Sequence, residues 1–126
     1  MATYTLRVET DFAAAHSLRG YDGNCARLHG HNWKVEVEMT GERLDGVGML
    51  VDFKTMKKAA REVAARVDHL YLNEIPPFDE INPTAENIAA WFFEQVAALL
   101  NGPTAQVSAV TIWETERAAV TYRESP

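Results

Sequence analysis

Two long stretches of the sequence alternate between apolar and polar residues, and this alternation constrains the fold more than any other feature. Between residues 4 and 16 the even positions carry most of the apolar side chains, and between residues 29 and 39 the odd positions do. A period of two is typical of β-strands that bury one face. The sequence therefore predicts two long strands near the N-terminus, with the turn-like segment Gly20-Tyr21-Asp22-Gly23-Asn24 between them.

The apolar period changes in the middle of the chain. Between residues 53 and 70, apolar residues recur every three or four positions, which predicts an amphipathic helix. Its expected core-facing stripe is Phe53, Met56, Ala60, Val63, Val67 and Leu70. A second helix is predicted to open at Pro83-Thr84, with Asn82 or Thr84 as its N-cap, and to end near Asn101. Its expected core-facing side chains are Ile88, Trp91, Phe92, Val96 and Leu99.

Two further strands are predicted after the helices. Residues 106–114 and 118–123 are rich in β-branched side chains, and the polar residues 115–117 between them indicate a hairpin. The element order is therefore ββααββ. Grouped strands and grouped helices predict an α+β fold, in which two helices cover one face of an antiparallel sheet. At 126 residues without a linker-like segment, the chain is expected to form one domain, residues 1–126.

Charge and composition exclude several classes of protein. The formal net charge is −6 and the basic residues are scattered, so a nucleic-acid binder is not expected. The first five residues do not resemble a signal peptide, and the sequence has no apolar run long enough to span a bilayer, which predicts a cytoplasmic protein that binds no membrane. The single cysteine, Cys25, cannot form an intramolecular disulfide.

Three histidines fall at the ends of the predicted strands with core-facing parity: His16, His29 and His31. A His-x-His pair places both rings on one face of a strand, and His16 can join them from the neighbouring strand. Three histidines without a fourth protein ligand match a catalytic zinc site, whose open position is left for water or substrate. The alternative from spacing alone is a set of hydrogen-bonded core histidines.

Three further positions carry possible chemistry. Cys25 is either a thiolate base beside the metal or a small buried hydrophobe. Asp68-His69, expected at the end of the first helix, is either an acid/base pair or a solvated helix end. Glu114 shares the parity of core residues and needs a partner, which is either an arginine of the chain or the guanidine-like edge of a ligand.

Several segments resemble, in order, the motifs of the 6-pyruvoyltetrahydropterin synthase and 6-carboxytetrahydropterin synthase family. They cover nearly the whole chain: Phe12-Ala13-Ala14-Ala15-His16, Cys25-Ala26-Arg27-Leu28-His29-Gly30-His31-Asn32, Val51-Asp52-Phe53, Asp68-His69 with Leu72-Asn73, Pro83-Thr84-Ala85-Glu86-Asn87 and Trp113-Glu114-Thr115. The resemblance implies a T-fold (tunnelling fold) subunit. It also implies a homo-oligomer, a hexamer built as a dimer of trimers, with active sites between subunits.

The resemblance also implies roles for individual residues. It makes Cys25 the proton acceptor and His69 with Asp68 the supporting relay. It makes Glu114 the anchor of the pterin substrate, with Thr84 and Glu86 lining the same pocket. The implied ligands of a Zn²⁺ ion are His16, His29 and His31.

The segment Ala26-Arg27-Leu28 looks like the bacterial 6-carboxytetrahydropterin synthase of queuosine precursor synthesis, a lyase. That enzyme converts 7,8-dihydroneopterin triphosphate to 6-carboxytetrahydropterin, acetaldehyde and triphosphate. A folate-pathway branch has a glutamate in this region. No acidic residue lies between Cys25 and His29, so that branch is disfavoured. A 6-pyruvoyltetrahydropterin synthase, a non-catalytic pterin- or metal-binding module and a zinc hydrolase for another substrate stay open as alternatives. The phosphate-binding cations are not identified, with Arg27 a possibility by position.

Overall fold

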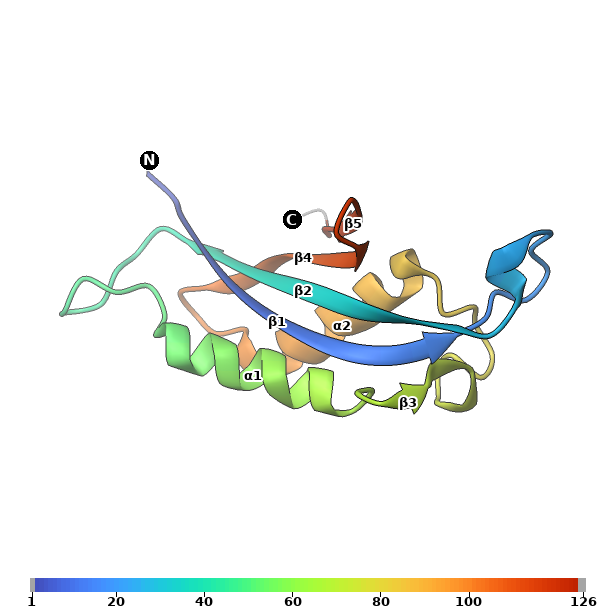
Figure 1. The fold of residues 1–126 in the computed structure, drawn as a ribbon. Coiled ribbons are helices and arrows are strands. Elements are labelled where there is room, and N and C mark those ends of the chain that lie inside the picture. The colour runs from blue at the N-terminus through green and yellow to red at the C-terminus, as the bar shows by residue number, and fades with distance from the viewer. Residues whose placement is uncertain (1, 125–126) are drawn as a thin grey trace.

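The computed structural model describes residues 2–124, and it contains the expected elements together with one further strand (Figure 1). The strands are β1 (Tyr4–His16), β2 (His29–Gly41), β3 (Leu70–Tyr71), β4 (Gln106–Thr115) and β5 (Ala118–Tyr122). The helices are α1 (Phe53–Ala65) and α2 (Ala85–Leu100), with short 3₁₀ turns at Asn24–Ala26 and Leu72–Glu74.

The strands form one sheet in the order β3-β1-β2-β4-β5. All pairs are antiparallel except β1 with β3, which is parallel and joins Ala14 to Leu70 and Ala15 to Tyr71. The sheet is therefore mixed, and the prediction of a purely antiparallel sheet is wrong in this one strand. A two-residue strand is too short to show a period in the sequence.

The long β1–β2 hairpin sets the position of the histidines. Its register runs from the pair Tyr4–Gly41 to the pair His16–His29, and Ala14 lies opposite His31. Because side chains alternate along a strand, this register puts all three histidine rings on one face at the same end of the hairpin. The same face carries the fully buried apolar residues of both strands, as the alternation predicts.

The core lies between this sheet face and the two helices, which cover the same side of the sheet in Figure 1. Trp33, Val35 and Val37 of β2 are fully buried there. Met56 and Val63 of α1 are buried against the sheet, and from α2 so are Ile88, Phe92 and Val96. Burial of this apolar surface provides the main driving force for the two-layer fold.

Both helices begin at side-chain caps. Asp52 accepts a hydrogen bond from Lys54 N at 2.8 Å, and Thr84 accepts one from Asn87 N at 3.1 Å, which confirms Thr84 as the cap of α2. Within the part of the chain that the structure describes, neither helix has the length and apolar character needed to cross a bilayer.

Helix α1 ends at Ala65, five residues earlier than the pattern predicts. Residues 66–69 form a turn after the helix, and within it His69 adopts a φ of 60°, where the chain reverses so that His69 N donates to Ala13 O. Residues beyond the turn therefore join the sheet edge. The expected core positions Phe53, Leu70 and Leu99 are exposed, because Phe53 and Leu99 lie at helix ends and Leu70 lies in the edge strand β3.

Candidate metal centre

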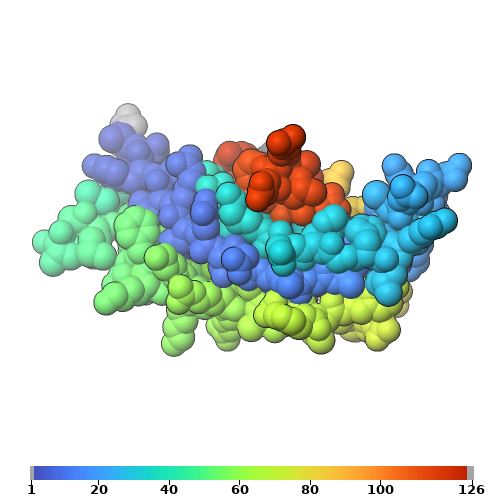
Figure 2. Space-filling view, viewed as in Figure 1, coloured from blue at the N-terminus to red at the C-terminus, as the bar shows by residue number. Residues whose placement is uncertain are grey.

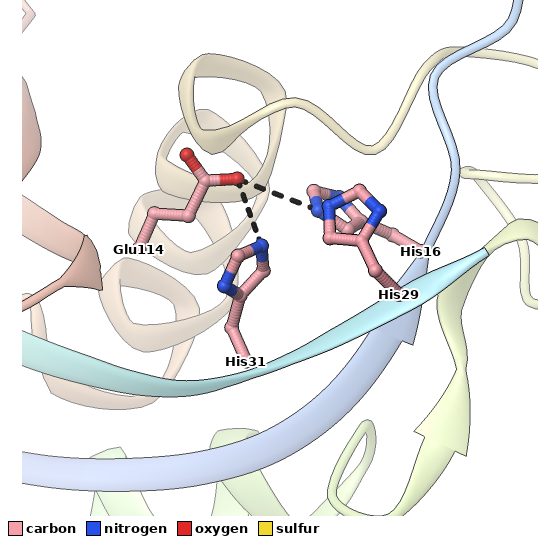
Figure 3. Close-up of side chains that lie close together, drawn as sticks. All are labelled: His16, His29, His31 and Glu114. Atoms are coloured by element: carbon pink, nitrogen blue, oxygen red, sulfur yellow. Dashed lines mark ion pairs between the residues drawn. The ribbon is translucent and has the colours of Figure 1, made fainter. Parts of the chain in front are cut away.

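Three histidine rings from two strands converge at one end of the sheet (Figure 3). The ring centroids of His16 and His29 are 4.5 Å apart, those of His29 and His31 4.9 Å, and those of His16 and His31 5.2 Å. With one carboxylate oxygen of Glu114, their nearest potential ligand atoms all lie within 4.8 Å of one another. The structure thus brings together the three histidines that the strand parity placed on one face.

Backbone carbonyls hold two of the rings in a defined tautomer. His16 Nδ1 donates to Pro83 O at 2.7 Å, and His29 Nδ1 donates to Arg27 O at 2.7 Å. A carbonyl oxygen only accepts, so the proton of each neutral ring lies on Nδ1 and the lone pair on Nε2. This second contact fixes the orientation of a ligating histidine in metal sites.

Two ring nitrogens in the cluster are buried without a hydrogen bond. Among residues 2–124, His16 Nε2 and His31 Nε2 are buried and have no hydrogen-bond partner, although Glu114 Oε1 lies 3.4 and 3.3 Å from them. Burial lowers the pKa of His16 and of His31, which keeps both rings neutral. Since unpartnered buried polar atoms are costly, these neutral nitrogens fit a metal ion, and the four-residue cluster can hold one.

Glu114 reaches the histidines from β4 through an irregularity in the strand. The β4–β5 pairing passes from Trp113–Ala119 directly to Thr115–Ala118, so Glu114 is an unpaired bulge residue. Its side chain is 32% exposed and faces His16 and His31. No arginine within the described residues pairs with it, so the alternative of an internal arginine partner is wrong.

A cleft of about 350 Å³ opens beside the cluster. Its walls include His16 and Glu114 together with Thr84 and Glu86 from the start of α2. The lining is completed by Leu18, Tyr21, Ala85 and residues 118–120. The pocket expected around Glu114, Thr84 and Glu86 therefore exists as one space, and their contact with a ligand stays a prediction.

Cys25 lies in the 3₁₀ turn Asn24–Ala26, in the loop that leads to the histidine pair. Its carbonyl accepts a hydrogen bond from Leu18 N at 2.9 Å. The residue is partly exposed, so the alternative of a buried hydrophobe is wrong. The proton-accepting role of Cys25 stays a prediction.

Asp68 and His69 form a pair after α1, in the turn that precedes β3, not at the helix end as expected. His69 Nδ1 lies 3.0 Å from Asp68 Oδ2, while Asp68 Oδ1 accepts from Ala13 N at 2.9 Å. These contacts, led by the Ala13 bond, lower the pKa of Asp68. His69 is 82% exposed and borders a second depression of about 510 Å³, whose lining includes His31 but not Glu114 or His16.

The backbone carbonyls that bind the histidine rings could not be predicted from the sequence. The carbonyls of Pro83 and Arg27, which orient His16 and His29, carry no side-chain signal. Every residue has a backbone carbonyl, so which one accepts a hydrogen bond from a histidine ring depends on the conformation of the loop. The position of Pro83 next to the predicted cap Thr84 is the nearest clue, because it ties the start of α2 to the sheet.

Comparisons with known proteins identify the family. The family model described as 6-pyruvoyl tetrahydropterin synthase matches residues 5–125. The 6-carboxy-5,6,7,8-tetrahydropterin synthase of Synechocystis is 35% identical over 119 residues, 90% of this chain and 88% of its own. The dihydroneopterin monophosphate aldolase of Pyrococcus furiosus is 36% identical over 103 residues, 82% of each chain.

The solved structures agree. The structure of Caenorhabditis elegans 6-pyruvoyl tetrahydropterin synthase superposes with a TM-score of 0.87 at 31% identity, covering 99% of this chain and 98% of that chain. The T-fold that the resemblance implies is confirmed. On the sequence match over residues 5–125 and this structural likeness, the chain belongs to the 6-pyruvoyl tetrahydropterin synthase family.

Proposed function

We propose that the protein is a zinc-dependent 6-carboxy-5,6,7,8-tetrahydropterin synthase that acts in queuosine precursor biosynthesis. The substrates are 7,8-dihydroneopterin triphosphate and one water molecule, and the products are 6-carboxytetrahydropterin, acetaldehyde and triphosphate. The observation that carries the proposal is the set of neutral, buried and unpartnered histidine nitrogens beside Glu114, at the wall of a cleft. The Synechocystis relative, similar over 90% of this chain, supports the choice of reaction.

The donor set favours zinc as the metal. Imidazole nitrogens with a carboxylate oxygen suit Zn²⁺ better than Ca²⁺ or Mg²⁺, which prefer all-oxygen surroundings. His16, His29 and His31 would hold the ion, with Glu114 beside them. When bound, the ion supplies Lewis acidity that eases deprotonation of a substrate hydroxyl.

The acidic side chains that line the cleft suit a pterin ring. Its lining contains the carboxylates of Glu114 and Glu86 and no lysine or arginine. The pyrimidine edge of a pterin offers parallel N–H donors, which a carboxylate accepts in a bidentate manner. Glu114 would therefore anchor this edge, with Glu86 and Thr84 as further acceptors, and the triphosphate would find its cations outside this lining.

Proton transfer is assigned to Cys25 and His69. The Cys25 thiolate would take a proton from the substrate side chain, and His69, oriented by Asp68, would exchange protons on the other side. In one chain His69 borders a different depression from the cleft. This separation supports sites shared between the subunits of a cytoplasmic hexamer, where His69 of one copy would serve the cleft of another.

The strand edges support such an assembly. Strand β3 pairs with β1 only at Ala14 and Ala15, so the rest of the outer side of β1 has no neighbouring strand within the described residues. Strand β5 forms the opposite edge of the sheet. Exposed edges of this kind can pair with strands of another copy.

A product assay tests the function. Zinc-loaded protein is mixed with 7,8-dihydroneopterin triphosphate, and the products are identified by mass. A 6-carboxy product with acetaldehyde supports the proposal. A 6-pyruvoyl product would transfer the chain to the sister activity named for the C. elegans structure, and zinc-loaded protein without turnover would contradict the enzyme assignment.

A further inference from the structure

Two asparagine side chains hold the segment that connects His16 to the loop of Cys25. Asn73 Oδ1 accepts from Ser17 N at 2.9 Å, and Asn73 Nδ2 donates to Ser17 O at 2.8 Å. Asn82 repeats the arrangement on Arg19, with its Oδ1 accepting from Arg19 N at 2.9 Å and its Nδ2 donating to Arg19 O at 2.8 Å. Each side-chain amide thus satisfies both backbone polar groups of one residue, as a neighbouring strand would.

Leu18, between these two residues, contacts Cys25 directly. Its backbone N–H donates to Cys25 O at 2.9 Å. Asn73 and Asn82 hold residues 17 and 19, on either side of Leu18. The Leu18 N–H that binds the Cys25 carbonyl is therefore held in place as well. Two further contacts reach the same segment, Ser17 Oγ with the Tyr71 hydroxyl at 3.1 Å and Arg19 Nη2 donating to Phe78 O, but both leave the backbone of residues 17–19 to the two asparagines. Beyond this segment the loop is open, since Tyr21 and Leu28 are exposed and Gly20 has a φ of +74°.

Asn82 also connects this segment to the metal centre. The next residue, Pro83, accepts the hydrogen bond from His16 Nδ1, and Asn82 O accepts from Asn87 Nδ2 of α2 at 2.9 Å. One short stretch before α2 therefore positions both a metal ligand and the Cys25 loop. A change in that stretch would alter the distance between the thiol and the metal.

We propose that Asn73 and Asn82 are positioning residues, whose paired amide contacts with residues 17 and 19 hold Cys25 in place relative to the histidine cluster. The proposal rests on the function proposed above only for its effect on turnover. Its structural part, the placement of the thiol, can be measured without substrate.

Alkylation of the thiol provides that measurement. Cys25 is the only cysteine in the sequence, so the intact mass of the protein during reaction with iodoacetamide reports this thiol alone. We expect N73A and N82A to be alkylated at least about threefold faster than the wild type, because the released loop exposes the thiol more often. Zinc content should be unchanged in N73A, because Asn73 does not contact the stretch that holds His16. In both variants kcat should fall about 10- to 100-fold with a smaller change in KM, since small misplacements of reacting groups are costly.

A third asparagine provides the control. Asn101 Oδ1 accepts from Val107 N at 2.7 Å, which ties the end of α2 to β4 away from the loop. N101A therefore loses a comparable backbone contact without touching residues 17–19, and it should be alkylated at the wild-type rate. Where N73A does not fold, N73D replaces it, because the aspartate keeps the acceptor for Ser17 N and loses the donor to Ser17 O.

The two proposals fail in different ways. Alkylation of N73A and N82A at the rate of N101A, or more slowly, overturns the positioning role whatever the turnover. A wild-type enzyme without the expected product overturns the proposed function, and the alkylation rates still decide on Asn73 and Asn82. Faster alkylation with an unchanged kcat would also contradict the proposal, because the loop would then be freed without consequence for the reaction.

Discussion

Glu114 Oε1 lies 3.4 Å from His16 Nε2, although the two residues belong to strands that are not neighbours. Strand β2 lies between β1 and β4, and the bulge at Glu114 turns the carboxylate across it toward the rings. The carboxylate also lines the cleft. Glu114 is thus positioned to interact with both a metal ion and a ligand.

Removing this charge should weaken metal binding. We expect E114Q to lower the zinc affinity about 10- to 100-fold, the range seen when a supporting partner of a metal site is lost. Competition with a chelator measures the affinity. E116Q, in the exposed turn after β4, is the matched control, and equal affinities of the two variants would contradict a role for Glu114 at the metal.

Replacing the thiol should separate chemistry from metal binding. We expect C25A to abolish turnover while zinc content stays at the wild-type level, because Cys25 is not part of the histidine cluster. Metal analysis and the product assay on the same preparation check both parts. Turnover near the wild-type rate in C25A would remove Cys25 from its assigned role.

Asp68 should make stability depend on pH in the acid range. Its folded-state pKa is lowered, first by the Ala13 N–H and then by His69, so the stabilisation is complete above the unfolded pKa of about 3.9. It is lost as the pH falls through the lower folded value. We expect D68N to be less stable than the wild type at pH 7 and the difference in Tm to shrink below about pH 4. A difference that stays constant down to pH 2.5 would count against this linkage.

On the helix-free side of the sheet, Glu38 is a nearly buried carboxylate between two arginines. Its side chain is 8% exposed, with Arg7 Nε at 2.5 Å and Arg123 at 3.3 Å. We expect the R7A/R123A double variant to lose stability, because the carboxylate is then left without a charged donor. Each single variant keeps one partner and should lose less than half as much. Urea unfolding measures the losses, and purely additive effects would contradict the shared partner.

The sequence predicted the parts of the site that depend on a regular period. His16, His29 and His31 could be placed on one face because the β1–β2 pairs keep their alternation to the last residue. The end of α1 could not be predicted, because the positive φ of His69, not a change in hydrophobicity, redirects the chain. The contacts of Asn73 and Asn82 could not be predicted either, because polar residues between the main elements have no period and their partners depend on tertiary structure.

The pairing of His16 with His29 at the final step of the β1–β2 hairpin has a consequence for folding. A slip of one residue between the strands would turn the β2 histidines to the opposite side of the sheet from His16. A metal ion bound by all three rings therefore stabilises only the native register. In this fold the metal would select the native pairing of the two strands, in addition to any part it has in chemistry.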